Sequence, residues 1–142
     1  MALHNDAKID RLHASKLFAR CDKKALTDLA SAVDEVRVAS GRTLFTQGSR
    51  HNEAYVIQSG TAEVLVDGNV VGEIPAGELI GEISLFDPGP ASATVQAKTD
   101  MELLVIPYNR FAQILDQTPG LAAAIARELA VRLRNTDARL KG

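Results

Sequence analysis

The sequence has a single cysteine, Cys21, and no apolar run that approaches the roughly 20 residues needed to cross a bilayer. One cysteine excludes a disulfide within the chain and fits a reducing compartment. The N-terminal segment MALHNDAKID carries charges where a secretion signal requires an apolar segment. These absences predict a cytoplasmic protein without a membrane partner.

Clustered basic residues are also missing. The chain holds 16 Lys and Arg against 18 Asp and Glu, which gives a formal net charge of -2. Duplex nucleic acids are bound through Lys and Arg that neutralise neighbouring phosphates, so we expect no direct nucleic acid binding by this chain. Its 142 residues, 46% of them hydrophobic, are enough for the core of one compact domain.

Catalytic and metal-binding patterns are absent as well. The histidines His4, His13 and His51 are scattered, whereas a metal site in a β-roll enzyme requires two or three His and a Glu close together on strands. No Ser-His-Asp or Cys-His arrangement can be argued either. We therefore expect neither an enzyme nor a metal protein, and no cofactor.

The hydrophobic pattern divides the chain into three regions. Residues 1–33 have a helical period, residues 35–107 alternate with a period of two between glycines, and residues 108–142 are helical again. Many short strands with close turn signals, such as Asp67-Gly68, favour a closed or double-sheet roll. We predict one domain, 1–142, of the α+β class and mainly β. It is an eight-stranded β-roll or jelly roll with N-terminal helices and a C-terminal helical pair.

The segment LIGEISLFDPGPASATVQA, residues 79–97, is the best candidate for a binding site. Gly81 lets a ligand approach the backbone closely, and a helical turn over residues 82–85 would direct its amides at an anion without a cation. Glu82 can accept hydrogen bonds from sugar hydroxyls, while Ser92 and Thr94 add hydroxyl groups. The alternative is a tight corner of the roll in which Glu82 caps backbone amides.

Three motifs in this order resemble the cyclic nucleotide-binding domain family, in particular its catabolite-activator members. The family's phosphate cassette reads roughly Phe-Gly-Glu-Leu-Ala-Leu and, after a variable loop, Pro-Arg-Ser/Ala-Ala-Thr-Val; this chain has IGEISL at 80–85 and PASATV at 90–95. The stretches GRTLFTQG at 41–48 and YVIQSG at 55–60 are similar to two further family motifs. The resemblance covers essentially the whole chain and implies a regulatory module that binds a small nucleotide such as cAMP.

The resemblance also implies roles for individual residues. Gly81, Ile83 and Ser84 would line the phosphate and ribose, and Glu82 would accept the ribose 2′-hydroxyl. Ser92 would lie near the phosphate or base. The remaining members of the implied pocket, which are small residues behind Ser92 and apolar residues around the ribose and base, are Ala93, Thr94, Val64, Val71 and Ile80.

The last helix resembles the segment that covers the ligand in the family's activators. Arg132 and Thr136 are four residues apart and so share one helix face. The resemblance implies that both face the pocket and that ligand binding moves this helix. An apolar stripe that includes Leu129 and Leu133 is compatible with core packing or with a homodimer. With no DNA-binding segment before Gly142, we expect an unidentified effector protein or the dimer itself to receive the signal.

Ala91 departs from the family pattern, because the family has an Arg there that binds the cyclic phosphate. Loss of such a charge-assisted hydrogen bond costs roughly 1.5–3 kcal/mol. Three interpretations follow. Backbone amides and Arg132 replace the charge, or the ligand is an uncharged nucleoside-like molecule, or the domain is a ligandless interaction module.

Overall fold

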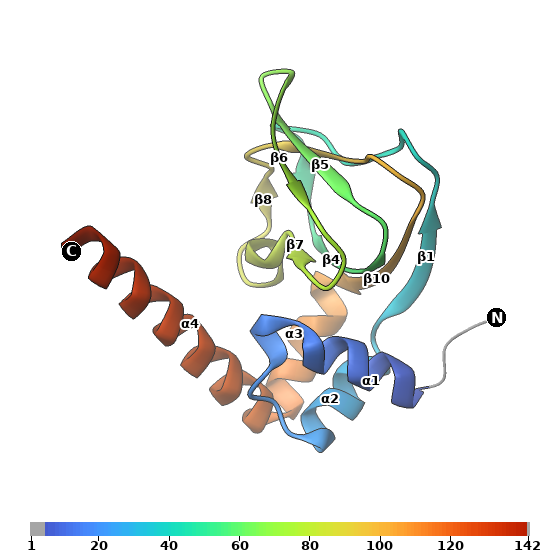
Figure 1. Ribbon diagram of the computed structural model, residues 1–142. Coiled ribbons are helices and arrows are strands. Elements are labelled where there is room, and N and C mark those ends of the chain that lie inside the picture. The colour runs from blue at the N-terminus through green and yellow to red at the C-terminus, as the bar shows by residue number, and fades with distance from the viewer. Residues whose placement is uncertain (1–4, 142) are drawn as a thin grey trace.

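The computed structural model describes the backbone of residues 5–141 and the side chains of residues 6–136. Figure 1 shows a β-roll with helices gathered at one end and one long helix that extends away from it. The helical elements are α1 (Asn5–Ala14), the 3-10 turn η1 (Lys16–Phe18), α2 (Lys23–Ala30), the 3-10 turn η2 (Glu82–Leu85), α3 (Tyr108–Gln117) and α4 (Pro119–Lys141). The expected N-terminal helices and C-terminal helical pair are therefore present.

The roll contains ten strands within the described residues. They are β1 (Asp34–Val38), β2 (Thr43–Phe45), β3 (Arg50–His51), β4 (Glu53–Ser59), β5 (Ala62–Val66), β6 (Asn69–Ile74), β7 (Leu79–Ile80), β8 (Gly89–Pro90), β9 (Thr94–Ala97) and β10 (Met101–Pro107). Two four-stranded antiparallel sheets have the orders β1-β10-β4-β7 and β2-β9-β5-β6, and β3 pairs with β8. The mainly β roll is confirmed. The strands exceed the predicted eight, and three of them, β3, β7 and β8, span two residues each and are too short to show a period in sequence.

Local chemistry explains two of the boundaries. The Asp22 carboxylate accepts a hydrogen bond of 2.9 Å from the amide of Ala25 and so caps α2, as its sequence predicts. Asp67 and Gly68 have φ values of 54° and 83°, the left-handed pair that a tight hairpin between β5 and β6 requires.

Alternation along β4 and β10 builds two cores from the same strands. Val56 and Leu104 face the helices, where they pack with Phe18 and Phe111. The adjacent residue on each strand faces the inside of the roll, where Ile57 and Leu103 pack with Ile80 and Val95. Because successive side chains on a strand point to opposite faces, one pair of central strands joins the helical layer to the roll.

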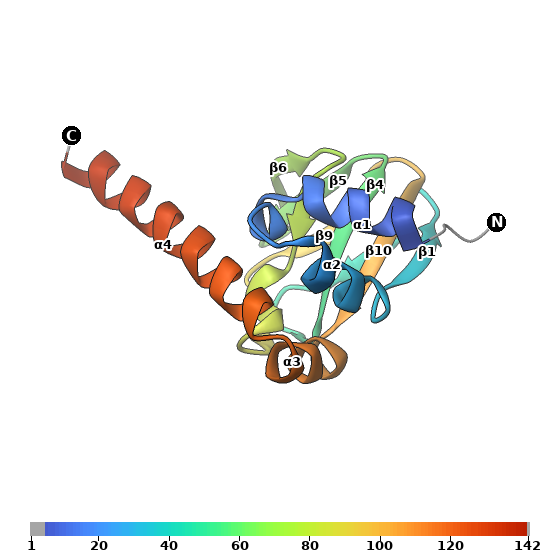
Figure 2. The same ribbon diagram turned by 90° about the horizontal axis from the view of Figure 1, so that it is seen from below.

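The first part of α4 is buried against the rest of the domain. Leu121, Ala124 and Ile125 are buried, whereas Leu129 and Leu133 are 40% and 64% exposed. Figure 2 shows the helix leaving the body of the domain. The apolar stripe thus divides into a buried portion and an exposed portion. No helix in the described part of the chain is both long and apolar enough to cross a bilayer.

Candidate functional site

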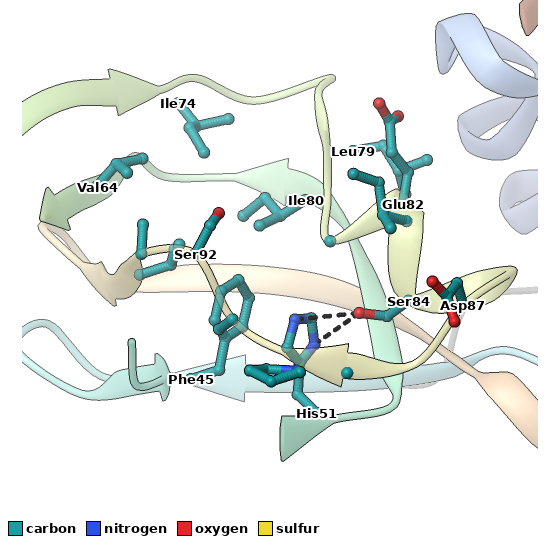
Figure 3. Close-up of a pocket in the computed structure, with 17 residues that line it drawn as sticks. Phe45, His51, Val64, Ile74, Leu79, Ile80, Glu82, Ser84, Asp87 and Ser92 are labelled. Carbon is teal, nitrogen blue, oxygen red and sulfur yellow. Dashed lines mark hydrogen bonds between the residues drawn. The ribbon is translucent and has the colours of Figure 1, made fainter. Parts of the chain in front are cut away.

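A cavity of about 500 Å³ opens inside the roll (Figure 3). Its wall comes from β2, β3, β5, β6 and the segment from β7 to β9. The lining residues are Phe45, His51, Val64, Ile74, Leu79, Ile80, Gly81, Glu82, Ile83, Ser84, Asp87, Gly89, Pro90, Ala91, Ser92, Ala93 and Val95. The candidate segment that begins at Leu79 therefore supplies most of the wall, and the apolar side chains of the roll core supply the rest.

Gly81 forms the corner at one end of this cavity. Its φ of 74° is left-handed, and a Cβ atom at this position would lie 3.1 Å from Cε1 of His51 and 3.2 Å from the backbone oxygen of Glu53. Only glycine meets both conditions without strain. The turn that follows is the 3-10 helix η2, in which the amide of Ser84 donates to the Gly81 oxygen at 3.0 Å. This amide is already bonded within the turn.

Glu82 is paired with a cation from α4. Its Oε1 atom lies 2.9 Å from Nη1 of Arg132, and both side chains are about one third exposed. Arg132 also lies 3.8 Å from Oε1 of Glu128 on its own helix. In Figure 3 the Glu82 carboxylate points away from His51 and Ser84. The ion pair links the wall of the roll cavity directly to the last helix.

A second cavity of about 380 Å³ lies on the α4 side of Glu82. Glu82 and Arg132 both line it, together with Ser15, Lys16, Glu78, Leu79, Glu128, Val131 and Asn135. Arg132 lines this second cavity and not the first. Glu82 is thus shared between a pocket inside the roll and a pocket beneath α4.

His51 occupies the polar end of the roll cavity. Its ring stacks on Phe45 with the centroids 4.2 Å apart and the planes inclined by 3°. The hydroxyl oxygen of Ser84 lies 3.1 and 3.0 Å from the two ring nitrogens, and Nδ1 lies 3.3 Å from the backbone oxygen of Glu53. Figure 3 shows the contact with Ser84. Pairing of β3 with β8, which sets His51 opposite Gly89, holds the ring there.

The structure brings most of the predicted residues together. Val64, Ile80, Gly81, Glu82, Ile83, Ser84, Ala91, Ser92 and Ala93 all line the roll cavity. Thr94 lies behind the lining, where its hydroxyl accepts a hydrogen bond of 2.9 Å from the amide of Gln47. The hydroxyl of Thr136 is exposed and donates to the backbone oxygen of Arg132 at 3.0 Å, so it does not face the roll cavity.

Val71 is placed differently from the prediction. It is 61% exposed and lies outside the cavity lining. Its neighbour Gly72 pairs with Val64, which does line the cavity, and side chains alternate along a strand, so Val71 points to the other face of the sheet. Ile74 occupies the inward position instead.

The charge of the lining is unusual for an anion site. Among the described residues that line the roll cavity there are two carboxylates, Glu82 and Asp87, and one histidine, but no Lys or Arg. The described residues also contain no group of three or more His, Cys, Asp or Glu that could hold a metal ion. A ligand here must be recognised by hydroxyl, amide and apolar groups, by His51, or by Arg132 across Glu82.

Comparison with known proteins identifies the family to which the domain is related. Residues 35–118 match the family model described as cyclic nucleotide-binding domain. The N-terminal domain of a transcriptional regulator from Streptomyces coelicolor A3(2) is 36% identical, with a TM-score of 0.84 over 92% of this chain and 95% of that chain. The catabolite activator protein of Thermus thermophilus is 28% identical, with a TM-score of 0.72 over 89% of this chain and 62% of that chain.

The curated relatives are much longer proteins. A cAMP-dependent protein kinase regulatory subunit from Mucor circinelloides f. lusitanicus is 33% identical over 70% of this chain and 23% of its own length. A lysophospholipase nte1 from Aspergillus terreus is 27% identical over 79% of this chain and 8% of its own length. The chain therefore spans less than a quarter of each of these two relatives.

Proposed function

Because the chain belongs to the cyclic nucleotide-binding domain family, we propose that it binds a cyclic nucleotide such as cAMP in the roll cavity and acts as a regulatory module. The relatives whose names refer to cAMP or to transcriptional regulation support a regulatory role and not a catalytic one. The free, buried Cys21 fits action in the reducing cytoplasm.

The main support for nucleotide binding is the cavity itself. Its volume of about 500 Å³ lies within the range of small-molecule sites, roughly 300–1,000 Å³. Val64, Ile74 and Ile80 offer apolar surface for a base and the carbon face of a ribose. Ser84, which lies beside His51, and Ser92, which lies near Val64 and Ile80, offer hydroxyl groups to a phosphate or a ribose (Figure 3). The lining thus offers both apolar surface and hydroxyl groups, which are the two kinds of group that a nucleotide requires.

The ion pair between Glu82 and Arg132 connects the proposed ligand site to α4, the helix that would transmit the signal. A ribose hydroxyl that donates to Glu82 would compete with Arg132 for the same carboxylate oxygens. Binding would then change the contact that holds the middle of α4 to the roll. If α4 has two orientations, a ligand shifts their populations by the difference in its affinity for them.

The exposed half of α4 is the surface on which we expect a partner to bind when the module signals. Leu129 and Leu133 lie beyond the buried part of the helix and are 40% and 64% exposed. A second copy of the chain, or an effector protein, would cover them when the helix is suitably oriented. The homodimer and the effector remain parts of this proposal.

A second candidate is an uncharged nucleoside-like ligand. It is favoured by Ala91, which is buried at the edge of the cavity where the family carries an Arg, and by the lack of Lys and Arg in the described lining. A ribose and base without phosphate would use the same hydroxyl and apolar groups and would not require a cation.

Isothermal titration calorimetry with cAMP, cGMP and adenosine tests the proposal. We expect saturable binding of a cyclic nucleotide that Glu82→Ala abolishes or weakens at least about tenfold. Glu73→Ala is the matched control, because Glu73 pairs with Lys98 on the outer surface and does not line the cavity. Binding of adenosine alone would favour the second candidate. Absence of binding by all three would contradict both.

A further inference from the structure

His51 is the one side chain in the described lining of the roll cavity that can carry a positive charge. The other ionisable groups of that lining, Glu82 and Asp87, are acidic. A negatively charged ligand that enters such a cavity loses water and meets no compensating Lys or Arg. Burial of an unpaired charge is costly, so the ligand's affinity depends on whether any group in the wall can become cationic.

The position of the ring suits this role. One side is supported by Phe45, whose stacked face also attracts a cation through its ring quadrupole. The ring edge lies at the Gly81 corner, within 3.1 Å of the place that a Cβ atom would occupy. The Ser84 hydroxyl is about 3 Å from both ring nitrogens, so Ser84 and His51 border the same part of the cavity.

We infer that His51, in its protonated form, neutralises the anionic phosphate group of the ligand in the roll cavity. This inference rests on the proposed function and assigns its charge recognition to one residue. Histidine is the side chain whose charge ordinarily changes between about pH 5 and 8. The inference therefore makes affinity for a phosphate-bearing ligand dependent on pH over that interval, with tighter binding at the acidic end.

Other charged groups near the ring do not account for such a change. They are Arg50 on its own strand, Glu53 and Tyr55 from β4, and Glu82 and Asp87 from η2 and the residues after it. Burial and the neighbouring Glu53 raise the pKa of Tyr55 above its ordinary value, and carboxylic acids and guanidinium groups as classes ordinarily change charge outside this interval. The strands β2 and β8 carry no titratable side chain. The phosphodiester of cAMP keeps one negative charge throughout the interval.

The test is a calorimetric titration with cAMP at about pH 6 and about pH 8. For the unaltered protein we expect affinity to be about tenfold higher at the lower pH, and binding near neutral pH to take up protons from the buffer. His51→Gln removes both the pH dependence and the proton uptake. His13→Gln is the matched control, since His13 lies in α1 and contacts the backbone oxygen of Ala19, and it leaves both unchanged.

The outcomes separate the inference from the proposed function. cAMP binding that is equally tight at both pH values, or that His51→Gln strengthens, overturns the inference and leaves the proposed function standing; the second result would mean that the ring only blocks the cavity. Adenosine, which has no phosphate, should bind with little pH dependence if it binds. Absence of binding by cAMP and adenosine even at about pH 6 overturns both the inference and the proposed function.

Discussion

Replacement of Gly81 by alanine tests the corner on which the cavity depends. A left-handed backbone costs a residue with a Cβ atom roughly 1–2 kcal/mol. Part of this, about 0.4–1 kcal/mol, is offset because alanine has less freedom than glycine in the unfolded chain. At Gly81 the added methyl also lies 3.2 Å from a backbone oxygen that cannot rotate away and 3.1 Å from the His51 ring. We expect Gly81→Ala to lower the free energy of unfolding by about 2 kcal/mol.

Alanine substitutions at Gly68 and Gly60 should destabilise the protein less and more, respectively, than Gly81→Ala. Gly68 has a similar φ of 83°, but an added Cβ atom would meet nothing within 4 Å, so Gly68→Ala should cost only the backbone strain, about 1 kcal/mol or less. Gly60 has a φ of 89°, and its added methyl would overlap the backbone oxygen of Asp100, so Gly60→Ala should be the most destabilising of the three. Urea unfolding of the three variants measures the order. If Gly81→Ala is no more destabilising than Gly68→Ala, the tight corner against His51 and Glu53 is wrong.

Three further predictions concern the charge, the coupling to α4 and the cysteine. Ala91→Arg should tighten cAMP binding by about tenfold or more in calorimetry, because it restores a charge-assisted hydrogen bond at the cavity edge. An unchanged affinity would mean that the loop geometry cannot direct the guanidinium at the phosphate. Arg132→Gln should change the free energy of unfolding by less than about 1 kcal/mol in urea, because the ion pair with Glu82 is one third exposed. The same substitution should alter cAMP affinity, whereas the control Arg134→Gln should not. An affinity that Arg132→Gln leaves unchanged would refute the coupling between the ligand site and α4. Burial and the neighbouring Asp22 raise the pKa of Cys21 to about 11. The folded protein should therefore react with a disulfide reagent at about pH 8 far more slowly than the urea-unfolded chain. Equal reaction rates would refute the burial of Cys21.

Sequence periodicity predicted the secondary structure of elements that are long enough to show a period. β4 and β10 span seven residues each, and runs of this kind between turn signals predicted the roll. The cassette motif also located most of the cavity wall, because glycine and small residues at fixed spacing reflect local backbone demands. Arg132 was predicted to face the ligand pocket, whereas the structure pairs it with Glu82 on the α4 side and leaves it outside the lining of the roll cavity.

His51 shows why the remainder of the site could not be predicted. It lies on β3, a strand of two residues that pairs with another strand of two residues far along the chain. Such strands have no measurable period, and the contact between His51 and Ser84 joins residues separated by 33 positions. Val71 was misplaced for a related reason, because the register shift between β5 and β6 at Val64/Leu65 is invisible in the sequence.

Titration of isotope-labelled protein with cAMP, followed through its backbone amide NMR signals, tests the central claim most directly. We predict saturable shifts that are largest at Gly81, Ser84 and Ser92 in the roll cavity, with smaller shifts in α4 near Arg132. Signals that do not move at millimolar cAMP, or that move only outside the roll cavity, would contradict the account.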